Sequence, residues 1–271
     1  PVNTLISHNT LEGYRFRVGG MTTSNLSKRF FMRGYAAYGT RDHKIKYSGE
    51  LEYSFHDKRY QPREFPVHSI RLIHTYDVNM IGQQYLFTNP DNLFLSIKRH
   101  EDHQINYLRS TKFIYALELA NNFSVTAEIA HERQYAAGLM RFVTPYGRIY
   151  SRFDETKFNL QLRYAPGEKI YQRGASRVSI NQDVPVIMLT QTYAPKGLMG
   201  SLFEINKTEL SVSKRFWLSA FGYIDGIVKT GHIWSSVPYP YLMFPNANLS
   251  YTIQPESFAL LNPMEFVTDS Y

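Results

Sequence analysis

Apolar and polar residues alternate with a period of two over long stretches of this chain. One such stretch covers residues 104–132, where Tyr115 and Leu117 fall on odd positions and Lys112 and Glu118 on even ones. A period of two is typical of a β-strand, because successive side chains point to opposite faces of a sheet. The pair Asn121-Asn122 tolerates the positive φ of a tight turn. The stretch therefore predicts a long β-hairpin with one apolar face and one polar face.

The same alternation predicts strands along the whole chain. We expect eleven strands at about residues 2–8, 14–21, 31–38, 44–55, 69–78, 104–119, 123–132, 157–164, 186–193, 209–213 and 218–229, with a twelfth beginning within 262–271. A short turn is expected at Lys214-Arg215, and the polar stretch 168–182 is assigned to no element. Long connections at 79–103, 134–153 and 232–259 broadly alternate with short ones, as in an up-and-down barrel.

Strand length and the residues on each face indicate whether the strands lie in a membrane or in a soluble sheet. Both arms of the 104–132 hairpin exceed the ~5–6 residues usual for a strand and approach or pass the ~9–11 with which a tilted strand crosses a bilayer. Their apolar face carries many aromatic residues, whereas a soluble sandwich core is dominated by Val, Ile and Leu. We predict an all-β fold, a transmembrane antiparallel β-barrel of the bacterial outer membrane with about 12 strands in this chain. A soluble sheet is the alternative for any single hairpin.

Composition supports a strand-based membrane span. Aromatic residues make up 15% of the 271 residues, with 21 Tyr, 18 Phe and 2 Trp, which suits the interfacial girdles of a barrel. Mean hydropathy is −0.35, and no apolar run approaches the ~18 residues of a membrane helix. No linker divides the chain, so we expect residues 1–271 to form a single barrel domain.

Net charge and cysteine content limit the kinds of site and of binding partner that we expect. The chain has a formal charge of +7 and no cysteine, which excludes disulfides and thiolate metal sites. The basic residues alternate with apolar ones instead of forming a patch, so we do not expect nucleic acid as a partner. Outer-membrane lipid and lipopolysaccharide are the expected partners, together with other outer-membrane or periplasmic proteins.

The polar face carries charges of both signs, which we expect to face the lumen of the barrel. Ion pairs that fill the lumen are one interpretation of this face, and a selectivity lining for a conducted solute is another. The expected lumen-facing residues are Arg15, Arg17, Lys44, Lys46, Glu50, Glu52, Arg71, Asp77, Lys112, Glu118, Glu128, Lys157, Arg163 and Glu209.

Sites for a metal or for catalysis are not expected. His100, Glu101 and His103 cluster in a polar connection, but a metal site needs three or four ligands that converge from rigid elements. Solvated loop polarity explains this cluster as well. No G-x-S-x-G motif is present, and a membrane-embedded hydrolase is the weaker alternative. We therefore expect no catalytic residue, no cofactor and no metal.

Two segments carry a resemblance to a known family. Residues 9–42 read NTLEGYRFRVGGMTTSNLSKRFFMRGYAAYGTRD, and residues 237–271 read VPYPYLMFPNANLSYTIQPESFALLNPMEFVTDSY. They resemble the outer-membrane barrels of Bacteroidota proteins with an N-terminal carboxypeptidase-regulatory-like domain, which are similar to the BamA/TamA superfamily. The resemblance implies a sixteen-strand barrel of the assembly and translocation type, without enzymatic activity. It also implies that about four closing strands follow Tyr271. Because the chain starts at Pro1 without a methionine, we expect it to be a mature or excised segment.

In that superfamily a loop after the eleventh strand folds back into the lumen, and residues 232–259 occupy this place here. Pro238, Pro240, Pro245 and Pro255 prevent the segment from extending the sheet. The superfamily's Val-Arg-Gly tip motif is absent, so the resemblance does not carry insertase activity over. A passive pore, or a structural barrel that anchors a periplasmic domain or belongs to a larger complex, is the alternative function. The residues expected to insert into the lumen are Tyr239, Tyr241, Leu242, Phe244, Asn246 and Asn248.

Overall fold

The computed structural model of the chain describes residues 5–80, 105–138, 141–143, 147, 149–174, 176–237, 241–247, 257–258, 260–261 and 265–271. Throughout these residues the regular structure is β, with two single-turn 3-10 helices, η3 (Leu198–Gly200) and η4 (Ser219–Phe221). Neither of these turns has the length or the apolar content to cross a membrane. The strands are β1 (Ile6–Asn9), β2 (Gly13–Met21), β3 (Phe30–Gly39), β4 (Ile45–Ser54), β5 (His68–Met80), β6 (Ile105–Glu118), β7 (Phe123–Tyr135), β8 (Phe142–Val143), β9 (Ile149–Tyr150), β10 (Arg152–Tyr164), β11 (Ile170–Arg173), β12 (Ser176–Ser179), β13 (Val186–Ala194), β14 (Ile205–Trp217) and β15 (Tyr223–Ile233).

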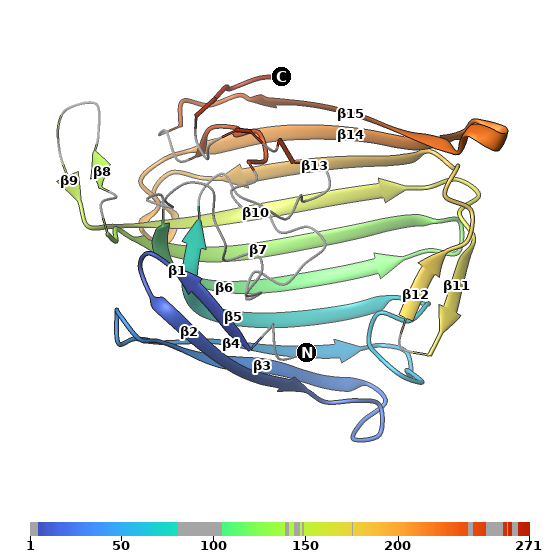
Figure 1. Cartoon of the computed structure of the whole chain (residues 1–271), viewed down its shortest axis with the longest axis horizontal. Helices are drawn as coiled ribbons and strands as arrows, with labels where there is room; N and C mark the ends of the chain where they lie inside the picture. The colour runs from blue at the N-terminus through green and yellow to red at the C-terminus, as the bar shows by residue number, and fades with distance from the viewer. Residues whose placement is uncertain are drawn as a thin grey trace.

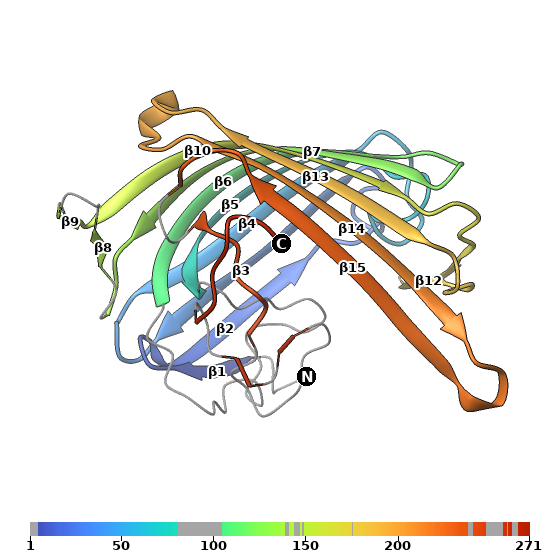
Figure 2. The ribbon, with the colours of Figure 1, turned by 90° about the horizontal axis from the view of Figure 1, so that it is seen from above.

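Eleven of these strands form one antiparallel sheet in the order β1-β2-β3-β4-β5-β6-β7-β10-β13-β14-β15. Each strand pairs with its predecessor in the sheet order, and the strands lie side by side across the molecule (Figure 1). The sheet curves into an arch, and the described C-terminal residues lie on its concave side (Figure 2). The arch is open, with β1 and β15 as its edges. The all-β prediction is confirmed, whereas a closed barrel is not formed by the described residues.

The eleven strands of the sheet correspond one to one with the first eleven strands predicted from alternation. The tight turn between β6 and β7 is also confirmed, because Asn122 has φ 62°. The stretch 168–182, which the sequence left unassigned, contains the β11–β12 hairpin, a small separate sheet. A second small sheet, β8–β9, lies in the long connection between β7 and β10.

The predicted turn at Lys214-Arg215 is wrong. Both residues lie inside β14, where Arg215 forms a bidentate pair with Asp225 of β15 at 2.6 and 2.8 Å. The chain turns instead at 218–222, where Gly222 adopts φ 94°. Two adjacent cations indicated a turn, but a carboxylate on the neighbouring strand compensates one of them within the sheet.

The C-terminal residues run along the end of β15 without forming a regular strand. Gly231 and Tyr271 exchange two backbone hydrogen bonds of 3.0 Å, and the Ile233 amide donates to the Asp269 carbonyl at 2.8 Å. The predicted twelfth strand is therefore represented by isolated antiparallel pairing of residues 268–271, while residues 262–264 lie outside the described residues. Ile233 also extends β15 into the connection predicted to begin at His232.

Candidate functional site: the polar concave face

Strand register gathers most of the predicted polar residues on one face of the sheet. Residues directly opposite one another share a face, and one such row runs Glu52, Arg71, Ile114, Glu128 and Asn159 across β4 to β10. The described residues from 241 onwards, here called the C-terminal segment, lie on the concave side of the arch (Figure 2). They cover part of this polar face, which is therefore the concave one. Ion pairs and hydrogen bonds connect its charges within two clusters and several smaller groups.

The N-terminal ion cluster consists of Glu12, Arg15, Asp42, Lys46 and Asp77. Arg15 donates to Asp77 at 2.5 and 2.8 Å and lies 3.2 Å from Glu12. Lys46 Nζ lies 2.7 Å from Glu12 and 2.6 Å from Asp42. Glu12 and Lys46 are fully buried, and charges removed from water are tolerated only when they are paired in this way.

Asp42 anchors this cluster to the turn before β4. The Tyr107 hydroxyl donates to its Oδ2 at 2.7 Å, and Lys46 Nζ donates to its Oδ1 at 2.8 Å. Burial opposes ionisation of this carboxyl, but the hydrogen bonds from Lys46 and Tyr107 outweigh burial and hold its pKa below the usual range. Asp42 therefore stays ionised, and the turn is held against both β4 and β6.

The central ion cluster consists of Lys112, Glu128, Glu132 and Lys157 on β6, β7 and β10. Lys112 Nζ lies 3.6 Å from Glu128 and 3.5 Å from Glu132. Lys157 Nζ lies 2.7 Å from Glu132. The sharing of Glu132 between two ammonium groups on two different strands ties three neighbouring strands together on this face.

The other predicted residues take part in smaller groups. Arg71 and Glu50 are 3.9 Å apart, Arg163 lies 2.8 Å from Glu168, and Glu209 lies 2.7 Å from Lys207. Glu52 accepts a hydrogen bond from Ser69 at 2.7 Å, while the Arg17 guanidinium lies 3.7 Å from the Tyr35 ring centroid. Glu118 ends β6 on the face of Lys112.

Lys44 has a different position. It precedes β4 in the 40–44 turn, and its Nζ lies 4.0 Å from the centroid of the Tyr107 ring. Tyr107 has the strand parity of the exposed Phe113, on the face opposite Lys112. The ammonium group of Lys44 thus lies over a ring at the end of β6 whose hydroxyl donates a hydrogen bond to Asp42, so it borders the N-terminal ion cluster.

The segment 241–247 packs against the concave face. The Tyr241 ring lies 5.6 Å from the Phe153 ring on β10. A Cβ added to Gly231 of β15 would lie 3.1 Å from Met243 Cε, so Met243 packs directly on this glycine. Met243 and Thr268 exchange two backbone hydrogen bonds at 2.9 and 3.1 Å. Of the residues expected to insert, Tyr241, Leu242, Phe244 and Asn246 lie in this segment, while Tyr239 and Asn248 fall outside the described residues.

Tyr241 meets the concave face beside Glu155 of β10. Glu155 is only 4% exposed, and the Tyr241 hydroxyl oxygen is buried. Burial and the neighbouring Glu155 carboxylate raise the pKa of Tyr241 well above its usual value of about 10. The phenol therefore remains protonated at neutral pH, and it places a neutral polar group next to the central ion cluster.

Sequence reasoning missed several charged residues of this face. Glu132 closes the predicted strand 123–132 with the parity of Glu128, so alternation could have found it. Glu155 has the parity of Lys157, but the predicted strand began at residue 157, two residues too late to include it. Glu12 lies in the β1–β2 turn, where the Asn9 side chain accepts from its amide at 2.8 Å and donates to its carboxylate at 2.6 Å. No periodic signal marks a turn residue, so only the folded structure reveals its pairing with Arg15 and Lys46.

The convex face is apolar and exposed. Its strands place Phe158 at 39% exposure, Leu160 at 42% and Val228 at 70%. One continuous row crosses seven strands through Met32, Leu51, Leu72, Phe113, Ile129, Phe158 and Tyr193. Soluble monomers rarely expose an apolar surface of this extent without a partner or a membrane to cover it.

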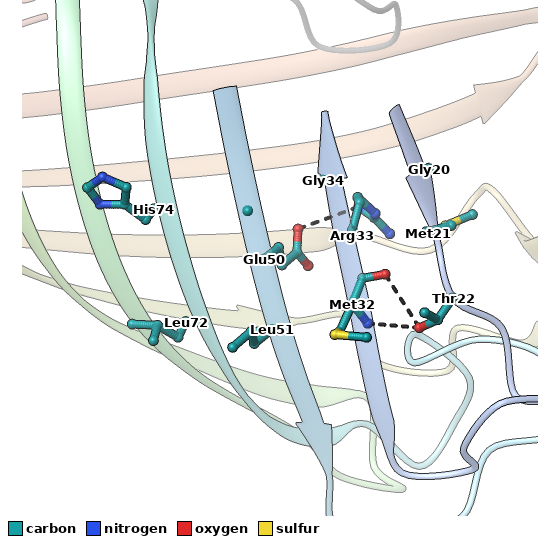
Figure 3. Close-up of a pocket in the computed structure, with 11 residues that line it drawn as sticks. Gly20, Met21, Thr22, Met32, Arg33, Gly34, Glu50, Leu51, Leu72 and His74 are labelled. Atoms are coloured by element: carbon teal, nitrogen blue, oxygen red, sulfur yellow. Dashed lines mark hydrogen bonds and ion pairs between the residues drawn. The ribbon is translucent and has the colours of Figure 1, made fainter. Parts of the chain in front are cut away.

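A shallow groove of about 550 Å³ crosses the N-terminal part of the convex face. Three glycines, Gly20, Gly34 and Gly49, lie opposite one another along its floor, and His74 continues their row. Figure 3 shows Leu72, Leu51, Met32 and Thr22 along one side. A Cβ at Gly20 or Gly49 would meet no atom within 4 Å, so the groove arises from missing side chains, not from backbone crowding.

Metal-ligating side chains do not gather in the described part of the chain. There, no three His, Asp or Glu side chains converge in a way that could hold a metal ion. The cluster of His100, Glu101 and His103 lies outside the described residues.

Comparisons with known proteins give no family for this chain. No protein-family model matches the sequence, and no curated protein matches it. The geometry of the two faces is therefore the basis for the functional argument.

Proposed function

We propose that this chain forms most of the wall of a bacterial outer-membrane β-barrel, with the convex face against lipid and the concave face around a polar interior. The observation that carries the proposal is the separation of most exposed apolar residues from the buried ion pairs across one eleven-stranded sheet. Transmembrane barrels have this arrangement, whereas a soluble sheet places its apolar face in the core.

Aromatic groups bound the apolar band at both ends. At one end Tyr47 and Tyr76 lie 6.1 Å apart, and at the other His68 packs 4.3 Å from Phe55 and 5.6 Å from Tyr115. Tyr76 and His68 are eight residues apart on β5, which corresponds to about 26 Å along the strand. With a strand tilt of ~35–45°, this distance gives a height of ~20 Å, close to the ~25 Å apolar band of outer-membrane barrels.

Within this class we propose a non-enzymatic role in protein assembly or translocation, as the resemblance implies. The segment 241–247 lies across the concave face through Tyr241 and Met243, which supports an interior that is partly filled. A passive pore or a structural barrel is the second candidate. The ion pairs that line the interior favour it, because a charged wall can select a solute.

Cysteine labelling tests the membrane proposal directly, because the chain has no native cysteine. Leu160→Cys on the convex face should react with a lipid-soluble maleimide in reconstituted vesicles, and Gln161→Cys on the concave face should react with a water-soluble one. Met32→Cys and Arg33→Cys form a second pair on β3. Equal labelling of both positions in each pair would refute the membrane arrangement.

Conductance in planar bilayers separates the two functional candidates. If the segment fills the interior, deletion of residues 239–248 should raise single-channel conductance several-fold, and Tyr241→Ala should raise it less. High conductance of the intact chain would favour the pore instead. Conductance that is low and unchanged by the deletion would favour a structural barrel with an external lid.

A further inference from the structure

A group of cations and aromatic rings lies where the apolar band meets the 40–44 turn. Lys44 Nζ lies 4.0 Å from the Tyr107 ring centroid, and the Arg109 guanidinium lies 5.4 Å from the Tyr76 ring centroid. The two rings are stacked on each other, with centroids 5.9 Å apart and planes 21° apart. Two cations therefore flank one stacked pair of tyrosines, each at cation–π distance.

By strand parity this group belongs to the convex face, where Tyr107 is itself buried and donates its hydroxyl to Asp42. Tyr107 and Arg109 share the parity of Phe113 on β6, and Arg109 lies directly opposite Tyr76 of β5. Arg109 precedes Phe113 by four residues, about 13 Å along the strand. The group is therefore adjacent to the apolar band at its aromatic boundary, where lipid headgroups meet a barrel wall under the proposed function.

Three cations of this region are exposed and form no direct ion pair within the described residues, although Asp42 accepts a hydrogen bond from the Tyr107 hydroxyl at 2.7 Å. Arg133 lies opposite Arg109 and is neutralised by Asp154 through hydrogen bonds of 2.5 and 2.8 Å. Arg152 follows on β10, on the same face and exposed. No carboxylate of the described residues forms an ion pair with Lys44, Arg109 or Arg152, in contrast to the paired cations of the concave face.

We propose that the exposed cations Lys44, Arg109 and Arg152, with the stacked Tyr76 and Tyr107 rings behind them, form a binding surface for the phosphate groups of an anionic lipid, named here the headgroup patch. Lys and Arg are the side chains that bind phosphate oxygens by charge-assisted hydrogen bonds. The stacked rings shield one side of Lys44 and Arg109 from water, which strengthens their attraction for an anion. The apolar band beside the patch accommodates acyl chains. This inference rests on the proposed membrane location and adds the lipid class and the residues that bind it.

The test compares lipid binding by the full chain and a double variant, Lys44→Gln/Arg109→Gln, purified in neutral detergent. The probes are lipid A, which carries two phosphates, its dephosphorylated form, and inorganic phosphate. Native mass spectrometry should show that the double variant binds lipid A at least about tenfold more weakly, because two charge-assisted contacts to phosphate are lost. The control Lys28→Gln/Arg63→Gln removes two exposed cations at the opposite ends of the strands and should bind like the wild type.

Three results would overturn the headgroup patch: wild-type affinity of the double variant, equal binding of dephosphorylated lipid A, or full displacement of lipid A by millimolar inorganic phosphate. The last result would assign a site for free anions instead. Insertion of the same proteins into vesicles, followed by urea extraction, separates this inference from the proposed function. If wild type and double variant both insert and bind lipid A equally well, only the headgroup patch is refuted. If the wild type fails to insert, both the patch and the proposed function are refuted.

Discussion

The two faces of the sheet differ in what they bury: the concave face buries charged residues, and the convex face exposes apolar ones. On the concave face, Lys46 is fully buried yet contacts two carboxylates, and Glu132 receives two ammonium groups. On the convex face, Leu160 and Val228 are exposed within the described part of the chain. In water this arrangement would be costly on both faces. A membrane outside and a polar interior inside would make both faces favourable, because each then meets a matching environment.

The largest predicted effect comes from breaking a buried ion pair of the concave face. Lys46→Met leaves Glu12 and Asp42 buried without their ammonium partner, and we expect it to lower the free energy of unfolding by about 3–5 kcal/mol. Urea unfolding in detergent measures this change. Arg29→Met removes an exposed ion pair with Asp57 and should change little, so a similar loss in both variants would contradict the contrast between buried and exposed pairs.

The second prediction compares the faces at neighbouring positions of one strand. Leu160→Arg places a charge on the convex band of β10 and should cost about 2–4 kcal/mol if the band lies at the bilayer midplane. Gln161→Arg places the same charge on the concave face and should be close to neutral. Equilibrium folding into lipid vesicles measures both variants. Equal costs would show that the two faces experience the same solvent.

The third prediction compares two glycines. Gly49 lies on the convex face, where a Cβ would meet no atom within 4 Å, so Gly49→Ala should stabilise the strand by about 0.5–1 kcal/mol. Gly19 lies on the concave face, where a Cβ would lie 2.6 Å from Tyr35 Cβ, and Gly19→Ala should cost about 1–3 kcal/mol. Thermal unfolding of the two variants measures the difference. Changes of the same sign would show that the faces are equally packed at this height.

The smallest predicted effect concerns the contact of the C-terminal segment with the concave face. Burial and Glu155 raise the pKa of Tyr241 in the folded state, so its contribution to stability is fully present below pH 10, the unfolded value, and is lost as pH rises further. Stability measured between pH 9 and pH 11.5 should therefore fall more steeply in the wild type than in Tyr241→Phe. Parallel curves would show that Tyr241 is not buried against Glu155 in solution.

Alternation alone located the strands because it depends only on residues that are adjacent in the sequence. Apolar residues at odd positions (Tyr115, Leu117) and charged ones at even positions (Lys112, Glu118) predict a strand whatever its neighbours in the sheet are. The strand β6 covers these positions. The exceptions are local conflicts. Lys214 and Arg215 read as a turn because of their polarity, but cross-strand pairing of Arg215 with Asp225 keeps them in β14.

The sequence by itself thus determined the all-β class, the eleven strands of the sheet and the segregation of apolar from charged residues along each strand. Tertiary structure decided which charges meet, since Glu12 contacts Lys46 and Arg15 contacts Asp77 only through the register of several strands. It also decided that the Lys44 ammonium group lies over the Tyr107 ring and that Tyr241 packs beside Glu155. The physical reason is range: periodicity arises from adjacent residues, whereas ion pairs and segment packing depend on the curvature of the whole sheet.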